Sequence, residues 1–232
     1  MKAFLLAGGR GERLRPLTDR MPKCLVPIRG TPLLGLWLDS LGRLGVADVL
    51  VNVSRFPDQV ERFVRSRGGA GPRVRVVPEA VPVGSAGTVA ASRTFVDGEE
   101  SFWIVYSDNL TNANLAPMLD FHRTHGDVLT MALFRTPDPQ SSGVVSLEAD
   151  RRISGFHEKP ARPVGNLANA GIYLARQTLF DGIPTGLALT DFGHHVLPGF
   201  VGRMRGYAIE GYLADIGTPA RLAQAEAEWP GL

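Results

Sequence analysis

A segment rich in glycine and arginine near the N-terminus is the first place where residue types suggest chemistry. It contains Gly8, Gly9 and Gly11, and Arg13 and Arg15 follow closely. Glycine lets the backbone bring several N–H groups against one anion, and a guanidinium can donate two parallel hydrogen bonds to phosphate oxygens. The segment therefore predicts a phosphate-binding loop, although the glycines alone would equally suit an ordinary tight turn.

Two common glycine-rich nucleotide motifs do not fit this segment. No Gly-Lys-Ser/Thr closes it, as a Walker loop would require, and the third glycine of a dinucleotide-binding loop is missing. The acidic residue that binds ribose in dinucleotide sites should end the second strand, but Asn52 stands there. The segment is therefore assigned to neither class.

Lysine is rare in this chain, because only Lys2, Lys23 and Lys159 are lysines among 25 basic side chains. Lys23 follows a proline and Lys159 precedes one. Where arginine is the usual cation, a retained lysine indicates a site that needs a compact ammonium, such as one beside a phosphate. Chance retention on the surface is the alternative for each of them.

Two aspartates complete the set of candidates. Asp108 follows an apolar run, and Asp215 begins the sequence Asp-Ile-Gly-Thr. Magnesium favours one or two carboxylates together with substrate phosphate oxygens, so this pair could hold Mg²⁺ if the fold brings it together. Each aspartate would also suit a turn, and Asp108 a helix cap.

The composition of the 232-residue chain, with 44% hydrophobic residues, allows a sizeable core. No stretch approaches the roughly 18 consecutive apolar residues of a membrane span, and Gly8, Gly9 and Arg10 interrupt any signal-peptide pattern. We therefore expect a cytoplasmic protein without a membrane partner. The single cysteine, Cys24, excludes an intrachain disulfide and a multi-cysteine metal site, so oxygen would hold any metal.

The charge is distributed unevenly along the chain. The formal net charge of +2 is too small to suggest a nucleic-acid partner, yet basic side chains clearly outnumber acidic ones in residues 1–30. This asymmetry predicts a local anion site near the N-terminus. A solvated charged loop is the plainer alternative.

Apolar periodicity predicts the elements that position these residues. Strand-like runs and helical spacings alternate in the first half, which is typical of a mainly parallel sheet covered by helices. The expected strands there are 2–7, 46–53, 74–77, 102–106 and 128–134, and the expected helices are 32–44, 56–64, 86–95 and 115–125. The second half predicts strands at 143–147, 152–156 and 168–174 and helical stretches at 192–201 and 219–228.

The predicted fold is therefore α/β, with a Rossmann-like, mixed but mainly parallel sheet sandwiched by helices and a small additional sheet in the second half. We expect residues 1–232 to form a single domain, because no linker or repeat separates two parts. Ligands of open α/β sheets bind outside the C-terminal ends of the strands. The loops after Ala7, Val53, Val77 and Tyr106 are thus the places where the site is expected.

These residues together resemble the sugar-1-phosphate nucleotidyltransferases. Residues 6–33 look like the signature of that family, and further pieces of the chain match in order over nearly its whole length. The matching pieces are residues 8–18, residues 22–27, Gly84-Ser85-Ala86-Gly87-Thr88, Asp108, Glu158-Lys159-Pro160, residues 169–173 and residues 215–219.

The resemblance implies a role for each matching position. Catalysis is implied for Arg13, Lys23 and Asp108, and metal binding for Asp108 and Asp215. Nucleotide binding is implied for Leu6, Ala7, Gly8, Gly9, Gly11, Gly84, Ser85, Ala86 and Gly87. Binding of the sugar and its phosphate is implied for Gly143, Glu158, Lys159 and Asn169.

The reaction implied by the resemblance joins a nucleoside triphosphate to a sugar 1-phosphate, with Mg²⁺ as cofactor, and releases pyrophosphate. The look of residues 84–87 favours a mannose- or heptose-1-phosphate guanylyltransferase, or another enzyme using a purine nucleotide. Uridylyl or thymidylyl transfer to glucose 1-phosphate or an amino-sugar 1-phosphate stays open. We expect a monomer or homodimer, and no C-terminal β-helix domain of the kind that some relatives carry.

Two readings of other classes remain: a non-catalytic regulatory homologue that binds a nucleotide-sugar, and a glycosyltransferase. A regulatory homologue would have no need to keep Arg13, Lys23, Asp108 and Asp215 together. A glycosyltransferase commonly holds its metal with an Asp-x-Asp pair, which is absent at Asp108. The chain also departs from the family pattern at Glu12, Cys24 and Ser107. Glu12 adds an anion beside the phosphate loop and could orient Arg13 or Arg15, and we expect Cys24 to be a buried, inert thiol instead of an alkylation-sensitive one.

Overall fold

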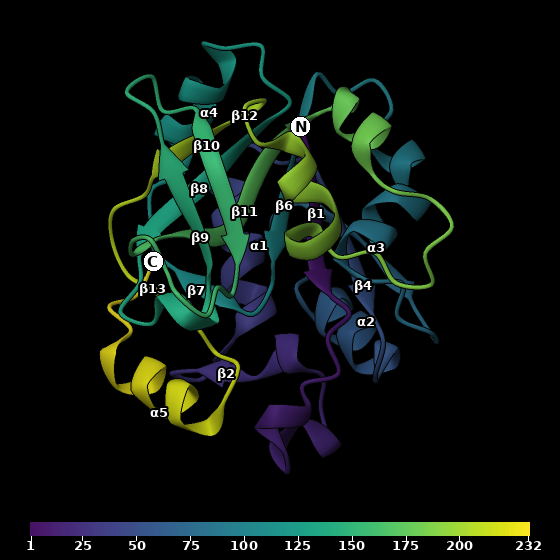
Figure 1. Cartoon of the computed structure of the whole chain (residues 1–232). Helices are drawn as coiled ribbons and strands as arrows, with labels where there is room; N and C mark the ends of the chain where they lie inside the picture. The colour runs from purple at the N-terminus through teal and green to yellow at the C-terminus, as the bar shows by residue number, and fades with distance from the viewer. The chain divides into compact units, whose positions relative to one another are not determined.

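The computed structural model describes all residues from 1 to 232 (Figure 1). The chain forms two compact units, each assembled from separated segments. Unit 1 comprises Met1–Pro82, Val105–Ala113 and Gly211–Leu232, and unit 2 comprises Val83–Ile104 and Asn114–Glu210. Strand β6 (Ser101–Tyr106) contributes residues to both units. No helix of the chain is both long and apolar enough to cross a membrane.

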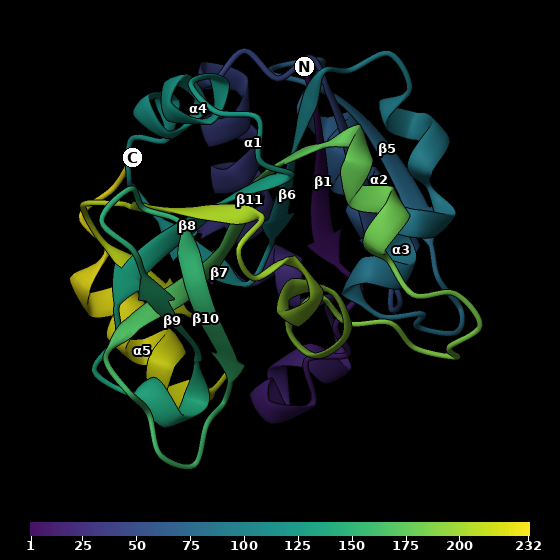
Figure 2. The same cartoon turned by 45° about the horizontal axis from the view of Figure 1, so that its top comes forward.

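Unit 1 contains three parallel strands in the order β1 (Lys2–Ala7), β4 (Asp48–Val53) and β5 (Arg73–Pro78). Ala7 pairs with Val53, so these strands end together. The helices α1 (Leu33–Arg43) and α2 (Pro57–Ser66) connect them, and α2 packs beside β5 (Figure 2). The β1 and β4 runs are almost wholly buried, as the uninterrupted apolar residues predict.

Several short elements surround these strands in unit 1. Three 3₁₀ turns follow β1, and two small antiparallel pairs and one helix complete the unit. The turns are Glu12–Leu14, Leu17–Asp19 and Lys23–Leu25; the pairs are β2 (Pro27–Ile28) with β3 (Thr31–Pro32) and β7 (Asn109–Thr111) with β13 (Leu213–Asp215); the helix is α5 (Pro219–Glu228).

Unit 2 is built mainly from antiparallel strands. Strand β11 (Leu167–Arg176) pairs with β8 (Leu129–Arg135) and β9 (Gly143–Leu147), and β9 pairs with β10 (Ile153–Glu158). The helices α3 (Ser85–Ala91) and α4 (Ala116–Arg123) also belong to this unit. One parallel neighbour, β12 (Met204–Ala208), joins β8.

The structure differs from the sequence expectations in several places, beginning with the short strands β2, β3, β7 and β13, which were not expected. The expected helix 86–95 ends as α3 at Ala91, and a 3₁₀ turn follows it. The expected helix 192–201 is a π turn followed by a 3₁₀ turn. Strand β12 was not expected, because Met204–Ala208 has no apolar run; Gly206 allows it to pack, since a Cβ there would lie 2.4 Å from Leu133 Cδ1.

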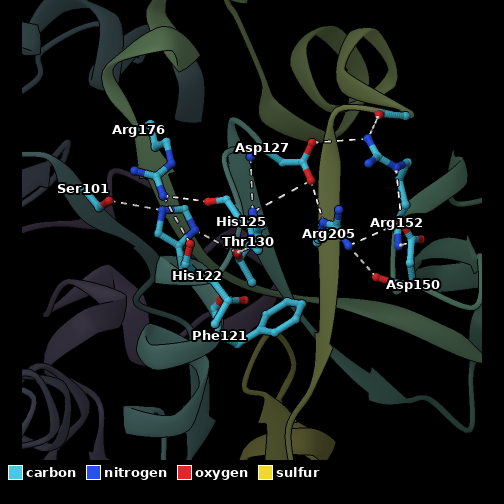
Figure 3. A network of polar contacts seen from close by, with 12 residues as sticks. Ser101, Phe121, His122, His125, Asp127, Thr130, Asp150, Arg152, Arg176 and Arg205 are labelled. Carbon is cyan, nitrogen blue, oxygen red and sulfur yellow. Dashed lines mark hydrogen bonds and ion pairs between the residues drawn. The ribbon is translucent and has the colours of Figure 1, made fainter.

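A buried polar network in unit 2 includes His122 of α4 (Figure 3). The His122 ring is fully buried, with Nδ1 2.8 Å from the Thr130 hydroxyl and Nε2 3.1 Å from the Ser101 hydroxyl. His125 Nε2 lies 2.9 Å from the same Thr130 hydroxyl. Burial lowers the pKa of both histidines, that of His122 to about 3. The network therefore holds both rings neutral at neutral pH.

Arginine–aspartate pairs continue this network (Figure 3). Asp127 accepts from Arg205 Nε at 2.6 Å and from Arg152 Nη1 at 3.3 Å. Arg205 also donates to the backbone carbonyl of Asp150 at 2.6 Å. These contacts join the loop before β8, the turn before β10 and strand β12, and so stiffen the edge of unit 2.

Candidate active site

One candidate site lies at the C-terminal ends of the parallel strands in unit 1. Asn52, near the end of β4, accepts a hydrogen bond from the Ala7 backbone N–H at 2.8 Å. Its amide donates to the Glu79 carboxylate at 3.0 Å. A Cβ on Gly8 would lie 2.5 Å from the Asn52 amide nitrogen and 3.3 Å from Glu79 Oε2. Glycine is thus required where the backbone leaves β1 beside a carboxylate.

The glycine segment then folds back on itself. Gly11 has a φ of +66°, and its carbonyl accepts from the Thr18 hydroxyl at 2.7 Å and from the Leu14 N–H at 2.9 Å. A Cβ on Gly11 would lie 2.8 Å from Thr18 Cγ2 and 3.5 Å from Lys23 Cβ. The loop therefore lies directly against Lys23. Leu6 is part of β1, and its carbonyl accepts from the Ser107 N–H at 3.0 Å.

The two aspartates expected to hold a metal are brought together in unit 1. Strand β13 pairs with β7 so that Asp215 faces Asn109, and the Ile216 N–H donates to the Asp108 carbonyl at 3.0 Å. Lys23 Nζ lies 2.7 Å from Asp108 Oδ2 and 3.8 Å from Asp215 Oδ1. One ammonium thus faces two carboxylates from segments that lie far apart in the sequence.

Two arginines complete this cluster. Arg221, in the first turn of α5, donates to Asp215 Oδ2 at 2.7 Å. A Cβ on Gly217 would lie 2.8 Å from Arg13 Nη2 and 2.9 Å from Asp215 Oδ1. The absence of a side chain at Gly217 therefore lets the Arg13 guanidinium approach the Asp215 carboxylate.

The donor atoms in this cluster fit a divalent cation. Asp215 Oδ1 is buried and has no hydrogen-bond partner, a costly state for a carboxylate oxygen unless a cation contacts it. Asp108 and Asp215 do not belong to any group of three or more His, Cys, Asp or Glu side chains. Two carboxylates with open coordination positions suit Mg²⁺, which takes its other ligands from water and substrate phosphates.

Unit 2 holds the second set of expected residues, of which Gly84–Gly87 open α3. Gly84 has a φ of +87°, and a Cβ there would lie 2.3 Å from the Thr190 carbonyl oxygen. That carbonyl accepts from the N–H groups of Ala86 and Gly87 at 2.9 and 3.0 Å. The Ser85 hydroxyl donates to Asp191 Oδ2 at 2.8 Å. The backbone of Gly84 is therefore fixed tightly against Thr190.

Three of the residues expected to bind the sugar and its phosphate also meet in unit 2. Glu158 pairs with Gly143 across β10 and β9, and a Cβ on Gly143 would lie 2.8 Å from Glu158 Oε2. The same oxygen would lie 2.6 Å from a Cβ on Gly193. Lys159 has a φ of +47°, and its exposed ammonium lies 3.7 Å from Glu158 Oε1. These contacts place one carboxylate and one ammonium beside a glycine-lined surface.

Asn169 lies on β11, next to the residue that pairs with β9. Its amide nitrogen donates to the Tyr173 hydroxyl at 2.6 Å, and its oxygen accepts from the Gly171 N–H at 2.9 Å. These bonds stabilise the irregular middle of β11, where the register with β8 shifts. Sugar binding by Asn169 stays a prediction.

The structure shows the surroundings of Cys24 and Glu12, two of the positions that depart from the family pattern. Cys24 is 1% exposed, which confirms that its thiol is buried, and burial raises the pKa of the thiol to about 12. The Glu12 carboxylate forms no ion pair with Arg13 or Arg15, although the Arg15 backbone N–H donates to the Glu12 carbonyl at 3.3 Å. It lies 4.0 Å from Arg10, while Arg15 pairs with Asp19 at 3.2 Å. The Arg10–Glu12 and Arg15–Asp19 ion pairs are both exposed to solvent, where such pairs contribute little to stability.

Sequence reasoning missed four polar residues of the candidate site, Asn52, Glu79, Asp191 and Arg221. Glu79 follows the apolar strand that ends at Val77, and that strand end was a place to search. The other three had no signal in the sequence, because their contacts depend on residues at least 6 and up to 106 positions away.

Comparison with known protein families identifies the class of transferase to which the chain belongs. The family model described as nucleotidyl transferase matches residues 2–230, and the chain belongs to this family. A Bacillus anthracis crystal structure that carries the name of a glucose-1-phosphate thymidylyltransferase superposes with a TM-score of 0.88 at 24% identity, covering 98% of this chain and 94% of that one. This likeness confirms the α/β fold.

Relatives with curated names are mannose-1-phosphate guanylyltransferases. The catalytic subunit beta of Danio rerio is 35% identical over 224 residues, mannose-1-phosphate guanylyltransferase 1 of Arabidopsis thaliana 33% over 225, and the catalytic subunit beta of Dictyostelium discoideum 31% over 223. Each match covers 94% of this chain and 62% of the relative. The chain thus spans less than two thirds of the length of these relatives.

Proposed function

We propose that the protein transfers a nucleoside monophosphate from a nucleoside triphosphate to a sugar 1-phosphate and releases pyrophosphate. The observation that carries this proposal is the cluster of Lys23, Asp108 and Asp215 against the glycine loop of unit 1. Family membership supports the reaction class. A protein that only bound nucleotide-sugars would not need two carboxylates placed to hold a cation.

The chemistry needs little from the protein beyond position and charge. An oxygen of the sugar 1-phosphate attacks the α-phosphorus, and the bond from that phosphorus to the oxygen bridging to the β-phosphorus breaks. Pyrophosphate leaves with the bond's electron pair. The nucleophile is already an anion, so no general base is required and no covalent enzyme intermediate forms. Catalysis then rests on orientation and on positive charge placed against phosphate oxygens.

The residues of unit 1 would divide this work. Backbone N–H groups of the glycine loop and the Arg13 guanidinium would hold the triphosphate. Lys23 would place its ammonium against the phosphates at the reacting centre. Asp108 and Asp215 would hold Mg²⁺, which when bound supplies further positive charge to the phosphate oxygens. Loss of one such preorganised charge typically costs about 3 kcal/mol of transition-state stabilisation, or about a hundredfold in rate.

The nucleotide that we propose is GTP. The relatives' names support a guanine nucleotide, and Glu79 supplies a chemical reason. The Watson–Crick edge of guanine presents two adjacent N–H donors, which a carboxylate can accept in parallel. Adenine and uracil present a ring or carbonyl acceptor there, which a carboxylate repels. Asn52 holds Glu79 beside Gly8, where the glycine loop would place a nucleotide.

The acceptor that we propose is a mannose-like hexose or heptose 1-phosphate. The relatives' names support it, and unit 2 contributes a carboxylate, Glu158, that could accept hydrogen bonds from sugar hydroxyls. Lys159 would bind the phosphate of the sugar, because its ammonium is exposed and extends from a strained backbone position at the end of β10. The enzyme would work as a monomer or homodimer.

One assay tests this proposal. Purified protein is incubated with Mg²⁺, each of the four nucleotides GTP, ATP, UTP and dTTP, and mannose, heptose, glucose or N-acetylglucosamine 1-phosphate. Pyrophosphate release that requires both substrates, and is fastest with GTP and mannose or heptose 1-phosphate, is expected. Asp215→Asn should abolish it, while Asp58→Asn on exposed α2 should not. Folded wild-type protein that releases no pyrophosphate with any pair would overturn the reaction class.

A further inference from the structure

The Lys23 ammonium occupies the position between the two carboxylates where a divalent cation would bind. It donates to Asp108 Oδ2 at 2.7 Å, while Asp215 Oδ1 lies 3.8 Å away. The Lys23 side chain is only 12% exposed, whereas the side chains of Asp108 and Asp215 are 40% and 34% exposed, so the ammonium is buried behind carboxylates that solvent can reach. The lysine therefore offsets the charge that a metal would otherwise offset.

The contacts of this ammonium are unequal. Asp108 receives a full hydrogen bond, but the separation from Asp215 Oδ1 exceeds hydrogen-bond distance, and that buried oxygen has no donor. The other oxygen of Asp215 is held by Arg221 at 2.7 Å, which fixes the carboxylate. A single lysine thus satisfies one of the two facing oxygens, whereas an ion that binds ligands on several sides could contact both.

Lys23 has a second set of partners in the proposed reaction. Its Cβ lies against the glycine loop, 3.5 Å from the position of a Cβ on Gly11, and that loop would hold the triphosphate. A small rotation of a flexible four-carbon side chain can carry the ammonium from carboxylates to phosphates. An ammonium beside Mg²⁺ would be repelled unless phosphates were present to receive it.

We propose that the Lys23 ammonium is an internal stand-in for the divalent cation, which leaves the two carboxylates only when a triphosphate offers it new partners. This inference rests on the proposed function for the metal pair. Its consequence is that metal alone binds weakly and that metal and nucleotide strengthen each other's binding. Between turnovers, the Lys23 ammonium would keep the carboxylates of Asp108 and Asp215 in position and offset their charge.

Metal affinity tests this device without measuring catalysis. Mn²⁺ binding is measured by the EPR signal of free Mn²⁺, first without nucleotide. Wild-type protein should bind weakly, and Lys23→Met should bind on the order of tenfold more tightly, a typical size for coupling between two bound ligands. Lys23→Arg keeps the positive charge, so its Mn²⁺ binding should stay as weak as that of wild type. Lys2→Met makes the same charge change at the opposite end of β1 and should match wild type.

Adding GTP completes the test. Wild-type Mn²⁺ affinity should rise on the order of tenfold, and most of that rise should be absent in Lys23→Met. Circular dichroism of each variant verifies folding. Equal or weaker Mn²⁺ binding by folded Lys23→Met, with Asp215→Asn abolishing binding, would overturn the stand-in while leaving the metal site intact. Failure of every variant to bind Mn²⁺, with or without GTP, would overturn the metal site and with it this inference.

Discussion

The buried histidine network predicts how the stability of the protein depends on pH. His122 is fully buried, and its two ring nitrogens face the hydroxyls of Thr130 and Ser101. Desolvation, followed by the positive charge of Arg176 and by His125, lowers the pKa of His122 from 6.5 to about 3. The folded protein therefore keeps this ring neutral at pH values where the unfolded chain protonates it.

The sign and size of the effect follow from linkage. Above the unfolded pKa of 6.5 neither the folded nor the unfolded state carries the proton, so His122 does not reduce the folding free energy there. As the pH falls below 6.5, only the unfolded state gains a proton, and stability falls by about 1.4 kcal/mol per pH unit until the folded ring titrates near 3. Between pH 8 and pH 5 this one group should therefore remove about 2 kcal/mol of folding free energy.

Urea unfolding at pH 8 and pH 5 measures this difference. His122→Gln keeps hydrogen-bonding groups but cannot titrate, so its stability should fall by about 2 kcal/mol less than that of wild type over this range. The pKa of His125 is lowered in the same direction, so some pH dependence should persist in the variant. His194→Gln, at an exposed histidine, should behave like wild type. Equal pH dependence in wild type and His122→Gln would refute the reasoning.

Three further substitutions and one unfolding experiment test the site and the fold. Glu79→Gln should lower the preference for GTP over UTP in kcat/KM by about tenfold or more, because an amide can pair with uracil; Glu61→Gln on α2 is the control, and an unchanged ratio would remove Glu79 from base selection. Gly84→Ala should lower the free energy of unfolding by about 3 kcal/mol, since the new Cβ would meet the Thr190 backbone, whereas Gly199→Ala has open space and should cost far less; equal urea midpoints would contradict this. Lys159→Ala should raise the KM for sugar 1-phosphate and lower kcat with little effect on GTP binding by calorimetry; equally weakened GTP binding would contradict its assignment to the sugar phosphate. Calorimetric unfolding should show one transition, because unit 1 is assembled from three chain segments and cannot complete itself while unit 2 is unfolded; two separated transitions would show independent domains.

The amino-acid sequence predicted elements whose signal is local. Uninterrupted apolar runs predicted β1, β4 and β6, and β9 and α5 were predicted with their observed bounds. The glycine segment predicted a tight loop after β1, as Gly8 and Gly11 now show by the atoms that a Cβ would meet. Each of these features depends on backbone freedom or on residue spacing within one segment, so the neighbouring residues are enough to reveal it.

Contacts between distant segments were decided by the tertiary structure. The sequence supplied Asp108 and Asp215 as candidates, but only the pairing of β7 with β13 brings their carboxylates around one ammonium. The sequence marked the loop after Val77 as a place to search, but only the tertiary structure places Glu79 beside Gly8. The physical reason is that local periodicity indicates which face of an element is buried and not which distant strand it will pair with. Residue types thus revealed what chemistry was available, and long-range strand pairing determined which groups could perform it together.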